Sequence, residues 1–122
     1  MVATAAAPGG GRHNHPQYLK GGLSMSRRRL VELMQDINFG RLEDVHVCDA
    51  EPVLDPAPGI VREIKFGGDN GPRPELHTGD FLLKSQIVEM FAHLDRVRDC
   101  HIETLEIKHG LPFRMLVRED AA

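Results

Sequence analysis

Apolar residues recur at helical spacing in two stretches of the chain. The first predicts a helix over 26–37, and the second predicts a helix over 81–95 with Asp80 as its N-cap. The apolar stripe of the first helix consists of Leu30, Leu33, Met34 and Ile37. The stripe of the second consists of Leu83, Ile87, Met90, Phe91 and Leu94. Stripes of this kind are typical of helices that pack on a core.

Alternation of apolar and polar residues follows each predicted helix and indicates strands. Strands are expected near 42–48 and 51–54, and a long strand over 60–66 would place Ile60, Ile64 and Phe66 on one face. In the second half, strands near 102–107 and 112–118 flank a two-residue turn at His109-Gly110.

The two halves resemble each other. Segment 30–37 matches 87–94 at an offset of 57 residues, and segment 42–53 matches 102–113 at an offset of 60 after a three-residue insertion. The simplest interpretation is an α+β fold made from a duplicated helix–β-hairpin unit. It would form one antiparallel sheet of about five strands with both helices on one face, related by a pseudo-twofold axis.

This arrangement predicts which side chains are buried and which are solvated. The expected buried residues are Leu30, Leu33, Met34, Ile37, Val45, Val47, Ile87, Met90, Phe91, Leu94, Leu105 and Ile107. The open sheet face should carry His46, Cys48, Glu106, Lys108, Arg114 and Arg118.

Changes in composition predict the domain organisation. Residues 1–23 are rich in Gly, Ala and Pro and are expected to be a disordered basic tail. Residues 24–122 are expected to form a single domain of two repeats, 24–66 and 80–120, joined by a Gly/Pro-rich linker at 67–79.

Each repeat resembles the YezD-type family of small bacterial helix–hairpin proteins. The resembling segments are 30–53 (LVELMQDINFGRLEDVHVCDAEPV) and, less closely, 87–113 (IVEMFAHLDRVRDCHIETLEIKHGLPF). The second departs by having Arg98-Asp99-Cys100 where the first has Asn38-Phe39-Gly40. The resemblance implies a helix–hairpin fold for each half and no functional residues. If family members are single-repeat chains that pair, this chain would be similar to a fused pair.

The overall charge conceals an asymmetry. The chain has 15 basic and 18 acidic residues, yet residues 1–29 contain five basic residues and no acidic one. A basic tail on an acidic body suits an anionic partner, self-association, or a solvated tail without a partner. No stretch approaches the roughly 18 apolar residues of a membrane span. Two cysteines make no disulfide scaffold and suit a reducing cytoplasm, which is the expected location.

Four residues suggest a speculative metal site. His46 and Cys48 are two apart on a predicted strand and would share a face, and Cys100 and His101 could add two more ligands if the repeats pack suitably. The set lacks the usual CxxC or HxxxH spacing. The alternative to a metal site is that the histidines face solvent and that the cysteines serve only as small side chains. The His13–His15 pair has even less to orient it.

Enzymatic chemistry has little support in the sequence. Cys100 and His101 are adjacent, but adjacency alone does not make a nucleophile–base pair. Glu43 and Glu103 occupy equivalent repeat positions, which ancestry explains as well as a carboxylate pair does. The Gly67–Gly71 loop lacks the Lys-Ser/Thr of a phosphate-binding loop. We therefore expect no catalytic residues and no cofactor.

Anion binding has one local signal. Arg27, Arg28 and Arg29 occupy the first turn of the predicted helix, where the helix dipole disfavours positive charge. Together with free N–H groups at that end they could hold phosphates, as in a nucleic acid. The acidic body and the single Tyr argue against it. The sequence favours a non-enzymatic protein-interaction or scaffold module that binds a protein partner or a second copy. A nucleic-acid or anion binder is the alternative, a metal-binding protein is a remote one, and no membrane contact is expected.

Overall fold

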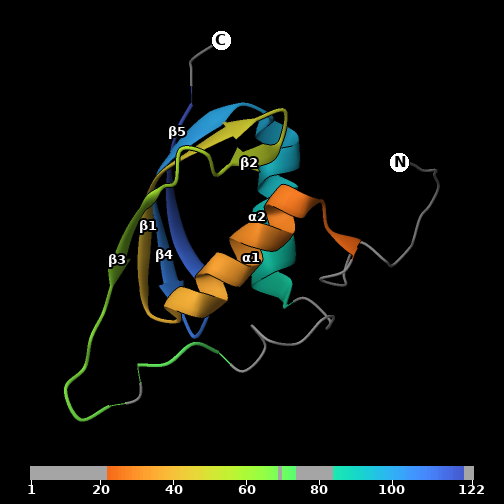
Figure 1. Cartoon of the computed structure of the whole chain (residues 1–122). Coiled ribbons are helices and arrows are strands. Elements are labelled where there is room, and N and C mark those ends of the chain that lie inside the picture. Colours follow the sequence, from red (N-terminus) through yellow and green to blue (C-terminus); the bar gives the residue numbers. More distant parts are fainter. Residues whose placement is uncertain (1–21, 69, 74–83, 120–122) are drawn as a thin grey trace.

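A computed structural model describes residues 22–68, 70–73 and 84–119 of the chain. The described part of the chain is α+β, with two helices and one antiparallel sheet of five strands (Figure 1). The predicted tail lies outside the described residues apart from Gly22 and Leu23, and Leu23 packs against the core. The predicted linker is described only at 67–68 and 70–73.

The first half contains one helix and three strands. Helix α1 (Met25–Ile37) begins after Ser24, whose Oγ accepts a hydrogen bond from the Arg27 amide at 3.3 Å. That bond satisfies one of the free N–H groups at the helix start. Three strands follow α1 along the chain: β1 (Gly40–Cys48), β2 (Glu51–Val53) and β3 (Gly59–Arg62).

The second half contains helix α2 (Ser85–Val97) and strands β4 (Cys100–Lys108) and β5 (Leu111–Arg118). The sequence-based start of this helix at residue 81 is wrong, because Lys84 has an extended backbone and is itself the N-cap. The expected cap, Asp80, lies outside the described residues. An apolar stripe indicates which face of a helix is buried but does not mark its first turn, which explains the error.

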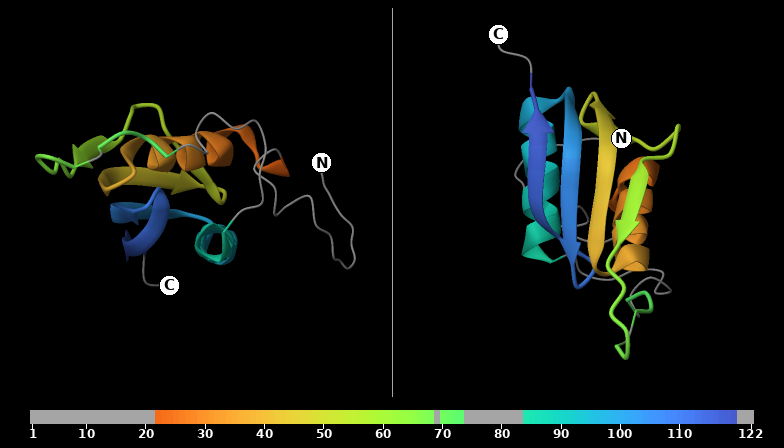
Figure 2. Two further views of the ribbon diagram at one scale, coloured as in Figure 1. Left: turned by 90° about the horizontal axis from the view of Figure 1, so that it is seen from below. Right: turned by 90° about the vertical axis from the view of Figure 1, so that its left-hand side faces the viewer.

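The sheet order is β2-β1-β4-β5, and β3 pairs with the same edge of β1 as β2 does. Strand β2 is opposite His46–Cys48, whereas β3 is opposite Gly40–Glu43. In the right-hand view of Figure 2 the strands face the reader and both helices lie behind them. The central ladder is β1–β4, with Leu42 opposite Leu105 and Val45 opposite Ile102.

The core lies between the helices and the inner sheet face. Eleven of the twelve residues expected to be buried are buried, and the exception is Leu33, which is only partly buried. Each fully buried Leu, Ile or Val contributes roughly 1.5–3 kcal/mol to folding. The main additions to the expected core are Val31, Leu42 and Ile102.

A backbone irregularity explains why Leu42 belongs to this core. Asp44 has a positive φ of 62° and is skipped in the β1–β4 register, as Glu103 is on the other strand. Skipping one residue reverses the side-chain alternation. Residues three apart, such as Leu42 and Val45, can therefore both face the helices. The buried residues Leu42, Val45 and Val47 are spaced by three residues and then two, and the same spacing recurs on β4 as Ile102, Leu105 and Ile107.

Element bounds in the two halves differ by a constant offset. The helices span residues 25–37 and 85–97, and the long strands span 40–48 and 100–108, so the offset is 60 for both. The sequence-based offset of 57 for the helices is wrong. It differs from the offset between the helix bounds by three residues, and three residues are close to one helical turn of 3.6. Two amphipathic helices therefore match almost as well at either offset.

Hydrogen bonds at the ends of the hairpins follow the same offset. The Ala50 amide donates to the Arg98 carbonyl at 2.6 Å, and the Gly110 amide donates to the Asn38 carbonyl at 2.9 Å. The two donors, Ala50 and Gly110, are 60 residues apart, and so are the two acceptors, Asn38 and Arg98. Each half therefore binds the helix end of the other in the same way.

Strand β3 is shorter than the alternation over 60–66 predicts. It ends at Arg62 because β1, its only recorded partner strand, begins at Gly40, directly opposite. Gly40 is required there, since a Cβ would lie 2.1 Å from the Val61 carbonyl oxygen. Beyond Arg62 the chain continues past the sheet, where Ile64 is 54% and Phe66 is 98% exposed.

Candidate functional site

The arginine triad does not form a shared anion site. The Arg27 side chain is only 14% exposed, and its Nη2 lies 2.5 Å from Asp95 Oδ1 and 2.8 Å from the Ala50 carbonyl oxygen. Its guanidinium carbon also lies 4.8 Å from the centre of the Phe91 ring. Arg27 thus joins α1 to α2 and to the first hairpin turn, and its charge is already compensated.

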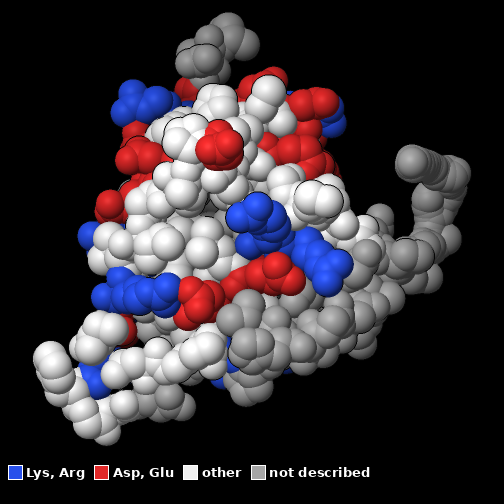
Figure 3. Space-filling view, in the orientation of Figure 1, with Lys and Arg blue, Asp and Glu red and all other residues white. Residues whose placement is uncertain are grey.

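The other two arginines lie on the exposed side of α1. Arg28 Nε is 3.5 Å from Glu32 Oε2, an i,i+4 pair along the helix, and Arg29 is exposed. Figure 3 shows the surface on this side, where basic and acidic side chains alternate rather than form an area of one sign. This distribution offers phosphate groups little more than scattered single charges.

The four candidate metal ligands are divided between the two faces of the sheet. His46 and His101 are cross-strand neighbours with ring centres 6.3 Å apart, and Cys48 is exposed. Cys100 instead lies in the core, because it alternates with its neighbour His101. Within 22–68, 70–73 and 84–119, no three His, Cys, Asp or Glu side chains are close enough to hold a metal ion.

Cys100 is also poorly placed as a nucleophile. Burial raises the pKa of its thiol, and the negative charges of Glu119 and Asp99 raise it further. The thiol is therefore held in its neutral, less reactive form. His101 faces the other way and places its Nε2 3.0 Å from Asp44 Oδ1.

The open sheet face carries the polar residues expected there, and several of them pair across strands. Arg118 Nη2 lies 2.6 Å from Glu103 Oε2, and Arg114 Nε lies 3.2 Å from Glu106 Oε2. On β1, Arg41 Nε lies 2.9 Å from Glu43 Oε2. Both repeat-equivalent glutamates, Glu43 and Glu103, thus bind arginines, and these exposed pairs each stabilise the fold by up to about 1 kcal/mol.

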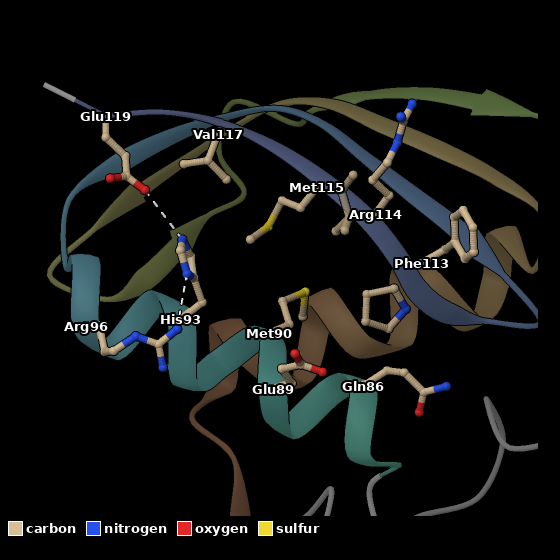
Figure 4. Close-up of a pocket in the computed structure, with 12 residues that line it drawn as sticks. Gln86, Glu89, Met90, His93, Arg96, Phe113, Arg114, Met115, Val117 and Glu119 are labelled. Carbon is tan, nitrogen blue, oxygen red and sulfur yellow. Dashed lines mark hydrogen bonds and ion pairs between the residues drawn. The ribbon is translucent and has the colours of Figure 1, made fainter.

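A groove with a volume of about 520 Å³ lies between α2 and β5 (Figure 4). The side chains of Met90 and Met115 both extend into the space between the helix and the strand. The apolar lining consists of Met90, Leu105, Pro112, Phe113, Met115 and Val117. The polar rim on the helix consists of Gln86, Glu89, His93 and Arg96.

One end of the groove is closed by charged groups. His93 Nε2 lies 3.5 Å from Glu119 Oε2, and Arg96 Nη2 lies 3.4 Å from His93 Nδ1. At the other end Phe113 is 58% exposed, and the Lys108 ammonium lies 4.0 Å from its ring centre. The groove is therefore apolar in the middle and has charged groups near both ends.

The backbone beside this groove is also unpaired on one side. Strand β5 is the last in the sheet order, and none of the other described strands pairs with its outer edge. Its eight residues present a row of N–H and C=O groups that can accept a further strand. Sequence reasoning found the alternation of Phe113, Met115 and Val117 but could not show that the strand is at an edge.

No family model, curated protein or solved structure matches this chain. The resemblance to the YezD-type family therefore stays a prediction. Among the described helices, none has the length and apolar character needed to cross a membrane.

Proposed function

We propose that this chain is a non-enzymatic protein-interaction module that binds an extended apolar peptide segment as an extra strand along β5. The observation that carries the proposal is the combination of an edge strand, whose outer side pairs with no other described strand, and a groove with an apolar middle directly beside it. Strand addition uses the backbone of the edge for affinity and the neighbouring pocket for alternate side chains. The groove supplies that pocket on the helix side.

The proposal includes the architecture. The domain would be a duplicated helix–hairpin unit with both helices on one face, working in the cytoplasm without a cofactor. The constant offset of 60 and the matched hydrogen bonds of Ala50 and Gly110 support a duplication. The β1–β4 register supports it too, since adding 60 to Leu42 and subtracting 60 from its partner Leu105 turns that pair into Ile102 and Val45, which is another pair of the ladder.

Nucleic-acid binding through Arg27–Arg29 has less support. Arg27 contacts Asp95 and Phe91, and Arg28 lies beside Glu32. Arg29 is exposed to solvent. Arg28 and Arg29 are exposed, but with a carboxylate already beside Arg28 they supply only a small part of what a phosphate backbone requires.

The experiment is a nuclear magnetic resonance titration of the isotope-labelled chain with an eight-residue peptide that alternates valine and serine. The expected result is saturable shifts of amides on β5 and on the groove side of α2. Two exposed residues of the same strand provide the matched variants: Phe113→Ser should weaken binding, whereas Leu116→Ser, on the open face, should affect it little.

A chemical control separates strand addition from nonspecific contact. Methylating the alternate backbone nitrogens on one edge of the peptide should abolish binding when that edge faces β5, and methylating the other edge should not. Shifts confined to α1, or equal effects of the two methylated peptides, would contradict the proposal.

A further inference from the structure

We propose that the strand accepted by β5 is supplied by a second copy of this chain, from the segment that runs past the end of β3. This inference rests on the proposed function, since it names the occupant of the same groove. The supplying segment, here the donor segment, is residues 62–66, Arg-Glu-Ile-Lys-Phe. It has the alternation of a strand, yet only its first residue pairs in the sheet.

The donor segment is held in an ordered turn although its apolar side chains are uncovered. Asn70 Oδ1 accepts from the Lys65 amide at 2.9 Å, and Asn70 Nδ2 donates to the Lys65 carbonyl oxygen at 3.0 Å. The Gly68 amide donates to the same carbonyl oxygen at 3.1 Å. Phe66 is nevertheless 98% exposed, so these bonds hold a large apolar side chain in solvent.

The donor segment cannot reach β5 of its own chain. Strands β3 and β5 lie on opposite edges of the sheet, as the right-hand view of Figure 2 shows. The acceptor must therefore belong to another molecule. A contact between opposite edges is heterologous, so each copy has one donor and one acceptor to offer.

The two edges also have compatible directions and faces. Strands β3 and β4 both run antiparallel to β1, and β5 runs antiparallel to β4. Two copies placed edge to edge in the same orientation therefore form an antiparallel ladder. Arg62 lies on the helix side, where its Nη2 is 2.6 Å from Asp36 Oδ2 on α1. By alternation Ile64 and Phe66 belong to that side.

One register places apolar side chains on apolar side chains. With Ile64 opposite the partner's Val117, Phe66 comes opposite the partner's Met115. Both partner positions line the groove. Phe66 and Ile64 would then cover part of the apolar lining and lose their own exposure to water.

The same register also pairs opposite charges. Arg62 comes opposite the partner's Glu119 on the helix side, and Glu63 comes opposite the partner's Arg118 on the open side. A shift of two residues that sets Ile64 opposite Met115 would instead place Lys65 opposite Arg114, which are like charges. Like charges directly opposite destabilise a strand pair, so the first register is favoured.

The experiment is sedimentation velocity of the full chain over a range from micromolar to millimolar. The wild type should show a concentration-dependent rise in mass, and Phe66→Ser should weaken association about tenfold or more through the lost apolar burial. Met25→Ser is the matched control, because Met25 is 81% exposed but lies far along the chain from the donor segment. A monomeric wild type, or equal losses in the two variants, would overturn the proposal.

Mixing tests the heterologous arrangement. Phe66→Ser retains its acceptor and Phe113→Ser retains its donor, so each alone should associate weakly and a mixture should form a heterodimer. Glu63→Arg and Arg118→Glu should each weaken association, and the double variant should restore it. Absence of both the heterodimer and the restoration would overturn the proposed register and occupant.

A labelled peptide of residues 59–66 separates this proposal from the function on which it rests. Binding of this peptide to β5 supports both. If the valine–serine peptide binds and this one does not, the second copy is the wrong occupant and the interaction module stands. If neither binds, both proposals fail.

Discussion

The two outer edges of the sheet differ although the halves have matching backbones. In the first half the outer strand is divided into β2 and β3 by a Pro-rich corner at 54–58. In the second half β5 is a single strand of eight residues, although it contains Pro112 and its pairing with β4 is irregular at Phe113. Short strands and prolines are common devices that prevent unwanted strand pairing. The first-half edge is thus divided into two short strands, whereas the second-half edge is one longer strand.

The residues beside these edges differ in the same sense. Leu33 of α1 packs against the core together with Leu54, whereas the residue 60 positions after Leu33 is His93, on the groove rim. The charges are also reversed. Asp36 pairs with Arg62 in the first half, whereas in the second half Arg96 corresponds to Asp36 and Glu119 lies beside His93. The difference between the edges is the reason that the proposed binding surface lies on the second half.

The largest expected effect comes from placing a charge in the shared core. Met90→Asp should unfold the domain, because Met90 is 5% exposed and an unpaired buried charge costs several kcal/mol. Leu33→Asp should cost clearly less, since Leu33 is only partly buried. Urea denaturation of both variants would measure the difference. Equal free energies of unfolding would contradict the assigned burial.

A second comparison concerns neighbouring arginines. Arg27→Ala should reduce the free energy of unfolding by about 1–3 kcal/mol, because it removes contacts with Asp95, the Ala50 carbonyl and Phe91. Arg29→Ala should change it by less than about 0.5 kcal/mol, as expected for an exposed position. Thermal and urea denaturation check both values. Equal effects would mean that Arg27 does not join the two helices.

The two hairpin turns provide a third, smaller comparison. Ala50 and Gly110 occupy equivalent positions with positive φ values of 66° and 71°. A left-handed backbone costs an L-residue roughly 1–2 kcal/mol, so Ala50→Gly should stabilise the protein by up to about 1 kcal/mol. Gly110→Ala should destabilise it, since the new Cβ would also lie 2.5 Å from Arg73 Cγ. Changes of the same sign would contradict the equivalence.

The smallest effect concerns the two thiols. Because the pKa of Cys100 is raised in the folded state, its contribution to stability is fully present below the ordinary thiol pKa. It is lost as the pH rises through the folded-state pKa. The free energy of unfolding, measured by denaturation in mildly alkaline buffers, should therefore fall gradually as the pH rises. Cys100→Ala should remove this dependence on pH, and Cys48→Ala should not. Labelling with a thiol reagent should be fast at exposed Cys48 and slow at Cys100.

Local patterns predicted most of the fold. The helical stripes identified most of the buried residues of α1 and α2, and alternation identified the strands and both turns. The offset of 57 was wrong for a reason inherent in local patterns, since a shift of about one helical turn preserves the stripe. The length of β3 was wrong because its end depends on where β1 begins, and that is a property of the pairing.

The candidate site was less accessible to sequence reasoning. The alternation of Cys100 and His101 already implies opposite faces, yet the core position of Cys100 follows from how β4 packs. The groove needs both α2 and the free edge of β5, which are separated along the chain and meet only in the folded domain. The alternation of Ile64 and Phe66 was correctly noticed, but their exposure became visible only with the sheet.

The most direct test of this account is amide hydrogen exchange of the folded chain with and without the valine–serine peptide. When the peptide is bound, amide exchange should become slower along the outer edge of β5 and should not change along β2 and β3. Slower exchange at β2 and β3, or no change on β5 at saturating peptide, would contradict the claim that the edge of β5 is the one that accepts the peptide.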